Sequence, residues 1–439
     1  MSMLSLSRAF AAVVFLAVST LAAQAFTIQE VESPGGIKAW LVHEKAVPLI
    51  AMDFSFKGGS ARDPADKLGV SEFLTGMMDE GAGEMLSAEF QQKRDALAFQ
   101  MSFESGRDYF GGSFQTLSRN RAESFELLRL AISSPRFDAE PLERVRQQFI
   151  LGVKNDAQDP QTIAFKNWMN AVLPGDPYAR ENTGTEASMS TISADDLRAA
   201  HKRIFTRNTL QVAVVGDIEA TELGPLLDKL FGSLPEGAAA AELPLAKPAQ
   251  LPNKVTQAQD IPQSVIIFGH EGIKRDDPDF MPAYVMSEIL GGGGFSSRLT
   301  AEIREKRGLT YGVDFSMSPM QRLGLYVGSL QTANEKAGEA LGLVRDVLAR
   351  MAADGPNQAE LDEAKTYLTG SYALRFSSNN AIANQLLALQ QQGLGKGYIE
   401  RRNSLIEAVT LDQVKAQAKR LLHPDRLIVS IVGKPEGTN

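Results

Sequence analysis

The stretch "ISADDLRAAHKRIFTRNTLQVAVVG" (residues 192–216) matches "VTLDQVKAQAKRLLHPDRLIVSIVG" (residues 409–433) without a gap. Each copy starts with a capping box, continues as an amphipathic helix and ends as a β-branched strand closed by a glycine. The capping boxes are Ser193 with Asp196 and Thr410 with Gln413. One helix-strand element therefore occurs twice, and this repeat decides how the rest of the chain is divided.

A second match lies upstream in both copies. Leu142 and Leu361 occupy equivalent positions in two helical runs, 219 positions apart, close to the 217 that separate residues 192 and 409. Agreement of the spacing at separate places favours duplication of a whole domain over chance similarity.

The segment between the copies is a linker. Residues 235–250 are rich in Ala and Pro, so we expect a first domain at 26–234, a linker at 235–256 that suggests a hinge, and a second domain at 257–439. Each half contains strands, then helices, then a closing strand. This order predicts an α+β fold of two homologous domains, each a mainly antiparallel sheet packed with helices.

The first 25 residues differ from the rest of the chain. Arg8 is their only charge, an apolar run follows it, and "AQA" at Ala23–Ala25 has the small-x-small pattern of a cleavage site. A single membrane anchor is the alternative, but the apolar run is short for crossing a bilayer. We expect a signal peptide at 1–25, cleavage near Ala25, and a mature chain in the periplasm with no membrane segment.

The composition excludes several classes of protein. A net charge of −8 with no long basic run argues against a nucleic-acid binder. The 439 residues include no Cys, which rules out disulfides, thiolate zinc sites and Cys nucleophiles.

The stretch "GGSARDPADKLGVSEFLTGMM" (residues 58–78) resembles the N-terminal motif of the pitrilysin/insulysin metallopeptidases. In that family, Gly-Ser-x-Arg ends a strand, and Gly-x-x-His-x-x-Glu-His-Met follows on a helix. The shared positions are Gly59, Ser60, Arg62, Gly69 and Met77. The first His is replaced by Glu72, the Glu by Thr75 and the second His by Gly76. The resemblance covers nearly the whole mature chain.

These replacements remove the chemistry of the motif. Two His four residues apart bind Zn²⁺ from one helical face, and the Glu between them takes a proton from the metal-bound water. Thr75 cannot be that base and Gly76 cannot be a ligand. By the resemblance, the third ligand falls at or near Val145, with Glu143 as the neighbouring alternative. The four His residues form no pair at zinc spacing, so we expect no metal, no cofactor and no catalytic residue that acts alone.

The stretch "LGGGGFSSRLTAEIREKRGLTYGV" (residues 290–313) is similar to the signature of the family's C-terminal domain. That signature is a Gly-rich turn, Ser-Arg-Leu, a helix, and an Arg followed seven residues later by a Tyr. The glycines here are Gly291, Gly292, Gly293 and Gly294. The resemblance implies that Arg304 and Tyr311 bind the substrate backbone and donate hydrogen bonds to the scissile carbonyl or its oxyanion. We expect Arg298 to be structural and to tie down the loop.

Each of these features also has a plain structural interpretation. The glycines could form only a flexible turn, Arg304 could be a solvated helix charge, and Tyr311 could be a core residue. The turn lacks the Gly-Lys-Ser/Thr ending of a phosphate loop, so nucleotide binding is not expected. The match of the whole run from 290 to 313 favours the functional interpretation.

The resemblance implies the zinc-less subunit of a two-chain periplasmic metallopeptidase. Its partner would be a homologous subunit that carries the intact motif and the zinc, and its substrate would be an unfolded peptide bound partly by strand addition. Alone, this chain would be inactive. Two alternatives stay open: a non-enzymatic scaffold protein, and a peptide-binding protein that acts alone or as a homodimer.

Overall fold

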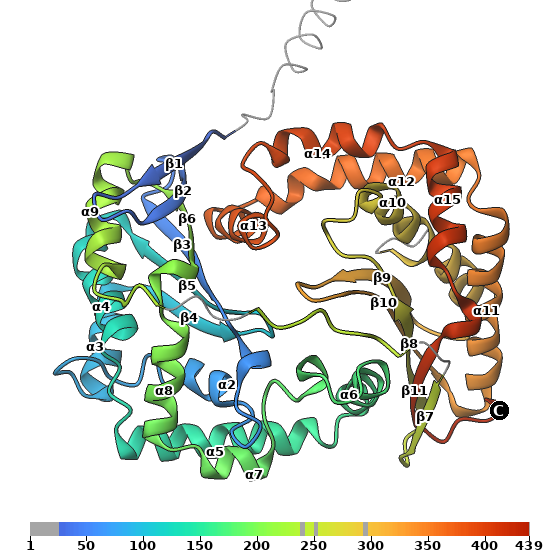
Figure 1. The fold of residues 1–439 in the computed structure, drawn as a ribbon, viewed down its shortest axis with the longest axis horizontal. Helices are drawn as coiled ribbons and strands as arrows, with labels where there is room; N and C mark the ends of the chain where they lie inside the picture. The colour runs from blue at the N-terminus through green and yellow to red at the C-terminus, as the bar shows by residue number, and fades with distance from the viewer. Residues whose placement is uncertain (1–25, 238–241, 250–252, 293–296, 439) are drawn as a thin grey trace, which may run out of the picture.

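The computed structural model describes residues 26–237, 242–249, 253–292 and 297–438 (Figure 1). The predicted signal peptide and its cleavage site near Ala25 lie outside these residues, as do Gly293 and Gly294 of the Gly-rich turn. Parts of the predicted linker, 238–241 and 250–252, also lie outside them.

The first sheet has six strands in the order β1-β2-β6-β3-β5-β4. Neighbouring strands run antiparallel, except that β2 and β6 are parallel. The strands are β1 (Ile28–Glu32), β2 (Lys38–His43), β3 (Leu49–Lys57), β4 (Gln100–Ser105), β5 (Tyr109–Leu117) and β6 (Leu210–Gly216). Every residue of β3 from Ile50 to Phe56 is buried, because helices cover both faces of the sheet at this point.

The second sheet repeats this order with five strands, β7-β11-β8-β10-β9. They are β7 (Asn253–Ala258), β8 (Gln263–Glu271), β9 (Val313–Pro319), β10 (Gly324–Ala333) and β11 (Ile428–Gly433). The one parallel pair, β7 with β11, stands where β2 and β6 stand in the first sheet. A Cβ added to Gly112 would lie 2.3 Å from the ring of Phe54, and one added to Gly328 would lie 2.7 Å from the ring of Phe268. The predicted fold class is confirmed, and the duplication extends to single contacts.

Helices pack on both sheets. In the first half they are α2 (Val70–Thr75), α3 (Ser87–Leu97), α4 (Arg121–Ser133), α5 (Ala139–Asp156), α6 (Pro160–Val172), α7 (Glu186–Thr191), α8 (Ala194–Ile204) and α9 (Ala220–Phe231). In the second half they are α10 (Phe280–Gly291), α11 (Ala337–Asp354), α12 (Gln358–Gly370), α13 (Asn379–Gln391), α14 (Tyr398–Glu407) and α15 (Leu411–Leu421). The predicted capping boxes begin α8 and α15. In the part of the chain that the structure describes, no helix is long and apolar enough to cross a membrane.

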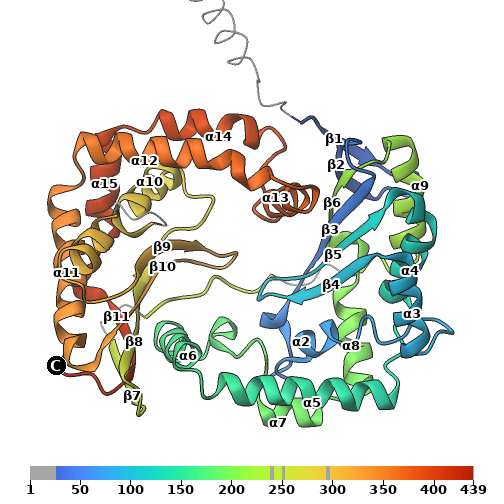
Figure 2. The same ribbon diagram turned by 180° about the vertical axis from the view of Figure 1, so that it is seen from behind.

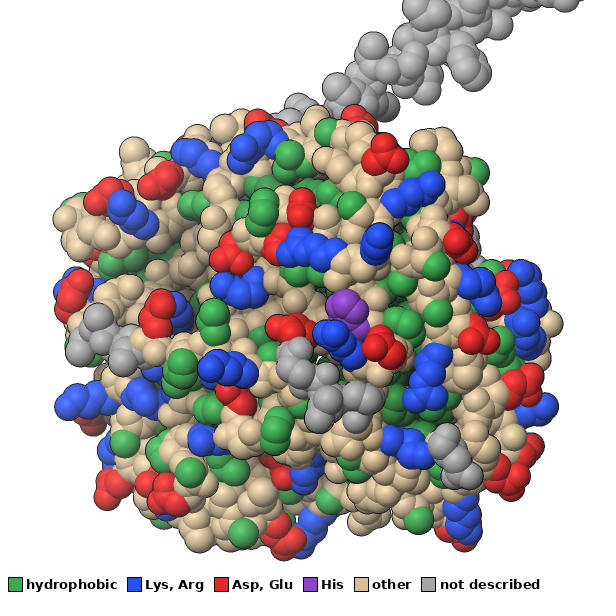
Figure 3. Space-filling view, turned by 45° about the vertical axis from the view of Figure 1, so that its right-hand side comes forward, with side chains coloured by type: hydrophobic (Ala, Val, Ile, Leu, Met, Phe, Trp, Pro, Cys, Tyr) green, Lys and Arg blue, Asp and Glu red, His purple; other side chains and the backbone are tan. Residues whose placement is uncertain are grey.

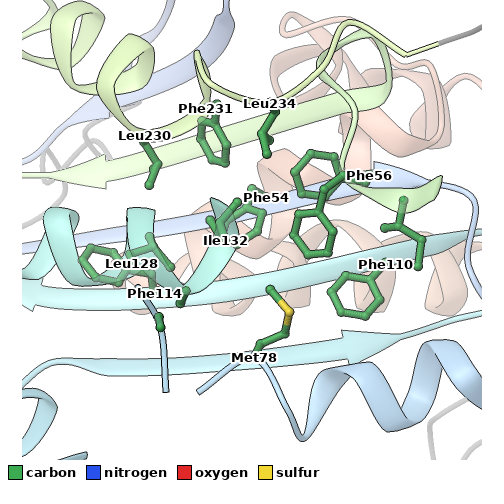
Figure 4. Packing of buried hydrophobic residues seen from close by; sticks show 14 of the residues in the cluster. Phe54, Phe56, Met78, Phe110, Phe114, Leu128, Ile132, Leu230, Phe231 and Leu234 are labelled. Carbon is green, nitrogen blue, oxygen red and sulfur yellow. The ribbon is translucent and has the colours of Figure 1, made fainter. Parts of the chain in front are cut away.

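Phenylalanines fill the core between the first sheet and its outer helices (Figure 4). The ring of Phe54 lies 5.6 Å from that of Phe231 on α9, and the ring of Phe114 lies 5.0 Å from that of Phe125 on α4. Each such side chain contributes roughly 1.5–3 kcal/mol when it is fully buried. This core fixes the outer helices and leaves the opposite face of the sheet for a different partner.

The helix that covers this opposite face comes from the other half of the chain. Helix α6 of the first half packs on the second sheet, and α13 of the second half packs on the first sheet (Figures 1 and 2). We call the two sheet faces covered in this way the inner faces. Buried residues of α6 meet the second sheet in one cluster: Ile163, Ala164, Trp168, Met169 and Val172 with Val265, Ile267, Leu325, Ile428 and Val432. Buried residues of α13 meet the first sheet in another: Ile382, Ala383, Leu386 and Leu387 with Val42, Ala51, Ala213 and Val215.

The exchanged helices tie the two halves together. The indole nitrogen of Trp168 donates to the carbonyl of Ile428 (2.9 Å), and the Gln390 amide of α13 donates to the carbonyl of Val212 (2.9 Å). Swinging the halves apart would expose both apolar clusters, at a free-energy cost of about 25 cal/mol for each Å² of apolar surface. This packing argues against the hinge expected at the linker.

Candidate functional site

The degenerate zinc motif lies on α2, which is firmly placed. Gly69 precedes the helix with a φ of +81°, and a Cβ there would lie 2.6 Å from the Met189 Cε, so only glycine fits. The carboxylate of Asp63 accepts hydrogen bonds from the Ser71 backbone N–H (3.2 Å) and from Arg203 (2.8 Å). The helix has therefore kept its anchorage although its ligands are gone.

The positions of the missing ligands lie together, and apolar side chains fill the space between them. A Cβ added to Gly76 would lie 3.0 Å from Val145 Cγ1 and 2.8 Å from Phe149 Cε2. Val145 on α5 is 2% exposed, whereas Glu143 is exposed and accepts a hydrogen bond from Arg146 (3.0 Å). The structure thus places Val145, not Glu143, beside the second-ligand position.

The remaining groups of the motif do not form a metal site. The Thr75 hydroxyl donates to the Glu72 carbonyl (2.7 Å), and the rings of Phe73 and Phe149 lie 5.5 Å apart. Among the described residues, no group of three or more His, Cys, Asp or Glu could hold a metal ion. The residues at this place do not fit a zinc ion, so no step in this chain can be assigned to one.

Glu72 is the one ionisable group left at these positions, and its surroundings disfavour its charge. Burial, together with the carboxylates of Asp63 and Glu104, raises the pKa of Glu72 to about 6. In an unfolded chain the same carboxyl would titrate near 4.5. The folded chain therefore holds this proton more tightly, and charged Glu72 lowers stability above pH 6.

We expect Glu72→Gln to stabilise the chain in a pH-dependent way. The substitution removes the unfavourable charge and should raise the free energy of unfolding by ~1 kcal/mol near pH 8, allowing for partial exposure. The gain should shrink as the pH falls through 6 and vanish near 4.5, where native Glu72 is protonated. Urea unfolding at several pH values measures it, with the exposed Glu363→Gln on α12 as control. A gain that does not change with pH would contradict this account of Glu72.

We expect Gly76→His, the first step of rebuilding the motif, to be destabilising. The backbone at Gly76 is helical, so the penalty comes from the contacts of the new side chain with Val145 and Phe149 and should be about 1–3 kcal/mol. Because Phe149→Ala opens the same space, the double variant should lose less than the sum of the single losses. Urea unfolding of the four proteins measures this coupling, and strict additivity would show that the space is not shared.

Arg304 lies in the helical segment η5 (Thr300–Glu305), and Tyr311 lies on the turn that joins η5 to β9. The Gly308 N–H donates to the Arg304 carbonyl (2.8 Å), and the Thr332 hydroxyl donates to the Leu309 carbonyl (2.6 Å), so the turn has a fixed path. Arg304 is half-buried. Tyr311 is 91% exposed, which excludes the interpretation of this residue as part of the core.

The described part of the Gly-rich turn allows close packing of a helix on a strand. A Cβ added to Gly291, the last residue of α10, would lie 2.6 Å from the Phe315 backbone nitrogen, so a glycine lets α10 pack directly on β9. Nearby, the Arg298 guanidinium bonds to both carboxylate oxygens of Glu360 (2.6 and 2.8 Å) and to the Gly355 carbonyl. Arg298 ties the described residues that follow the Gly-rich turn to the start of α12, in keeping with the structural role expected for it.

Comparison with known proteins identifies the family. A family model described as "Peptidase M16 inactive domain" matches residues 191–368. A solved structure of a peptidase M16 inactive domain from Pseudomonas fluorescens is 30% identical to this chain, covers 93% of it and 98% of its own length, and superposes with a TM-score of 0.86. The chain belongs to the M16 peptidase family. It is an inactive member, since the zinc ligands of the pitrilysin-type motif are absent, and the resemblance seen in the sequence is confirmed.

Other proteins similar to this chain cover it almost end to end. The non-peptidase homolog YmxG of Helicobacter pylori is 25% identical over 94% of this chain and 95% of its own length. The structure of a protease from Helicobacter pylori, at 17% identity and a TM-score of 0.84, covers 93% of this chain and 99% of its own and shares its fold.

The structure also shows a polar site that the sequence analysis of this M16 chain missed. A hollow of about 510 Å³, the first hollow, lies between the inner face of the first sheet and α13; among its lining residues are Asp53, Ser102, Glu104 and Asn384. Asp53 is only 6% exposed, and burial, with some contribution from Glu104, raises its pKa to about 6. The signal in the sequence was an Asp inside the apolar run "LIAMDFSF" of β3.

Proposed function

We propose that this chain is the zinc-less subunit of a two-chain M16 metallopeptidase that hydrolyses unfolded peptides. It would lend Arg304 and Tyr311 to a zinc site held by a homologous partner. The observation that carries the proposal is the contrast between its two sites. The ligand positions at Gly76 and Val145 are closed by packing, whereas Tyr311 is held on a fixed turn and is almost fully exposed.

The side chains of Arg304 and Tyr311 are suited to bind a carbonyl group. A phenolic hydroxyl and a guanidinium both donate hydrogen bonds, and they gain strength as negative charge develops on the carbonyl oxygen. The role of this chain would be to bind and orient the peptide and to stabilise that charge. The metal and the general base would both belong to the partner subunit.

An open sheet edge supports peptide binding. Among the described residues, β4 pairs with β5 alone, so its outer edge is available for an added strand. The equivalent edge strand of the second sheet, β9, is covered by α10. There the Ser287 hydroxyl accepts a hydrogen bond from the Met317 N–H (3.2 Å), and Gly291 lies against Phe315. Helix α2 contacts β4 as well, but less extensively than α10 contacts β9, so β4 is the better suited of the two equivalent edges to receive a peptide.

The exchanged helices bear on how a peptide would enter. Because α6 and α13 lock the two halves of this chain together, a closed complex would open between subunits rather than within one of them. We also propose that the complex works in the periplasm, on the evidence of the signal-like N-terminus. Positive and negative side chains alternate over the face shown in Figure 3, which suits a peptide partner better than a nucleic acid.

Reconstitution tests the proposal. The mature chain should carry no stoichiometric zinc and should not hydrolyse an unfolded peptide. Hydrolysis should appear when a homologous M16 subunit with an intact zinc motif from the same organism is added. The proposal would be overturned if the single chain bound one zinc ion and hydrolysed the peptide in the absence of any partner.

A non-enzymatic role is the second candidate, as a peptide-binding or scaffold protein derived from a peptidase. The open β4 edge favours it equally, and one relative of almost the same length is named a non-peptidase homolog. It predicts peptide affinity for the lone chain and no effect of Tyr311 on any hydrolysis.

A further inference from the structure

The inner face of each sheet carries a hollow at the same place. The first hollow lies beside α13, as described above. The second hollow, of about 430 Å³, is lined by residues of the second sheet, by Gln161 at the start of α6, and by the turn that carries Tyr311. Its polar lining residues are Gln161, Gln263, Thr310, Tyr311, Asp314, Ser329 and Gln331.

The two hollows are products of the duplication. In the first, the Asn380 amide of α13 donates to the Gln115 side chain on β5 (2.8 Å). In the second, the Gln331 amide on β10 donates to the Gln161 side-chain oxygen of α6 at 3.5 Å, a longer contact in which donor and acceptor are exchanged. Each exchanged helix thus places an amide at its N-terminal end over the inner face of the opposite sheet. The second hollow is therefore a built feature of the fold.

The lining of the second hollow sets what it can hold. The Ser329 hydroxyl donates to one carboxylate oxygen of Asp314 (2.5 Å), and because Asp314 is exposed its carboxylate can accept a further hydrogen bond. The amides of Gln263 and Gln331 add both donors and acceptors. An apolar side chain would leave these groups unpaired, and a carboxylate would meet the charge of Asp314. A polar side chain that donates hydrogen bonds satisfies both conditions.

Tyr311 links this hollow to the peptide bond whose carbonyl the Tyr311 hydroxyl would hold. A peptide whose carbonyl accepts a hydrogen bond from the Tyr311 hydroxyl has a neighbouring side chain within a few ångströms, at the mouth of the hollow. We propose that the second hollow is a side-chain subsite that selects a hydrogen-bond-donating polar residue, such as Gln, Asn or Lys, next to the bond held by Tyr311. This inference rests on the proposed function, because that function is what places a peptide at Tyr311.

Peptide binding to the purified mature chain tests the subsite. The probes are fluorescein-labelled 12-residue peptides of Ser and Ala in which one residue is Gln, Lys, Glu or Leu, moved along the sequence. Gln and Glu are nearly isosteric and differ mainly in charge and hydrogen bonding, whereas Leu is of comparable size and offers no hydrogen bond. At one position, the Gln and Lys peptides should bind about tenfold more tightly than the Glu and Leu peptides.

Variants of the lining separate this effect from peptide binding in general. Asp314→Asn should bring the Glu peptide close to the Gln peptide, and Gln331→Leu should improve the Leu peptide, whereas Gln148→Leu on the exposed side of α5 should change neither. If the peptides bind equally at every position but weaken in Tyr311→Phe, the subsite is refuted and the proposed function stands. Absence of any peptide binding to the chain alone would also refute the subsite, and hydrolysis by the reconstituted complex would then decide the proposed function separately.

Discussion

Peptide hydrolysis by the two-chain complex is expected to fall about 10²–10³-fold in kcat when Tyr311 of this subunit is replaced by Phe. The substitution removes one hydroxyl and leaves the ring in place. Since Tyr311 is 91% exposed, the stability of the subunit should not change. A steady-state assay of the reconstituted complex, with a saturating concentration of an unfolded peptide, measures the effect.

The control for this prediction is another surface tyrosine. Tyr367 on α12 is 47% exposed, and Tyr367→Phe should leave kcat unchanged. If the Tyr311→Phe complex and the native complex were equally active, Tyr311 would have no role in holding the substrate. That result would favour the scaffold interpretation.

Trp168→Ala is expected to lower the free energy of unfolding by about 3–5 kcal/mol. Trp168 is fully buried between α6 and the second sheet, and its indole nitrogen holds the Ile428 carbonyl across the two halves. Its loss leaves a cavity in the exchanged contact and removes the hydrogen bond from the indole to the Ile428 carbonyl. Urea unfolding of the mature chain measures the difference.

Phe165→Ala is the matched control, because Phe165 lies on the same helix and is 38% exposed. It should lower the free energy of unfolding by less than ~1 kcal/mol. If Trp168→Ala has an equally small effect, the exchanged helices do not hold the halves together, and the linker would again be a candidate hinge.

The sequence predicted what depends on local pattern. The repeat at 192–216 and 409–433 predicted α8 with β6 and α15 with β11, and both capping boxes form as expected. Hydrophobic period and cap residues act within a few positions of the chain, so one sequence is enough to read them.

The sequence could not predict what depends on packing between distant segments. Nothing in α6 or α13 indicates that each covers the sheet of the other half, because an apolar helical face looks the same whichever sheet it meets. The choice between Val145 and Glu143 was open for a similar reason. The two lie two residues apart on α5, and the burial of Val145 and its contact with Gly76 distinguish them.

The most direct test of the central claim is to isolate the tagged mature chain from its native cells and measure zinc and peptide hydrolysis in what is recovered. We predict a complex with a homologous subunit that carries an intact zinc motif, one zinc per pair, and hydrolysis that is lost in Tyr311→Phe. Recovery of the chain alone or paired with itself, with no hydrolysis, or with zinc bound to this chain, would contradict the account.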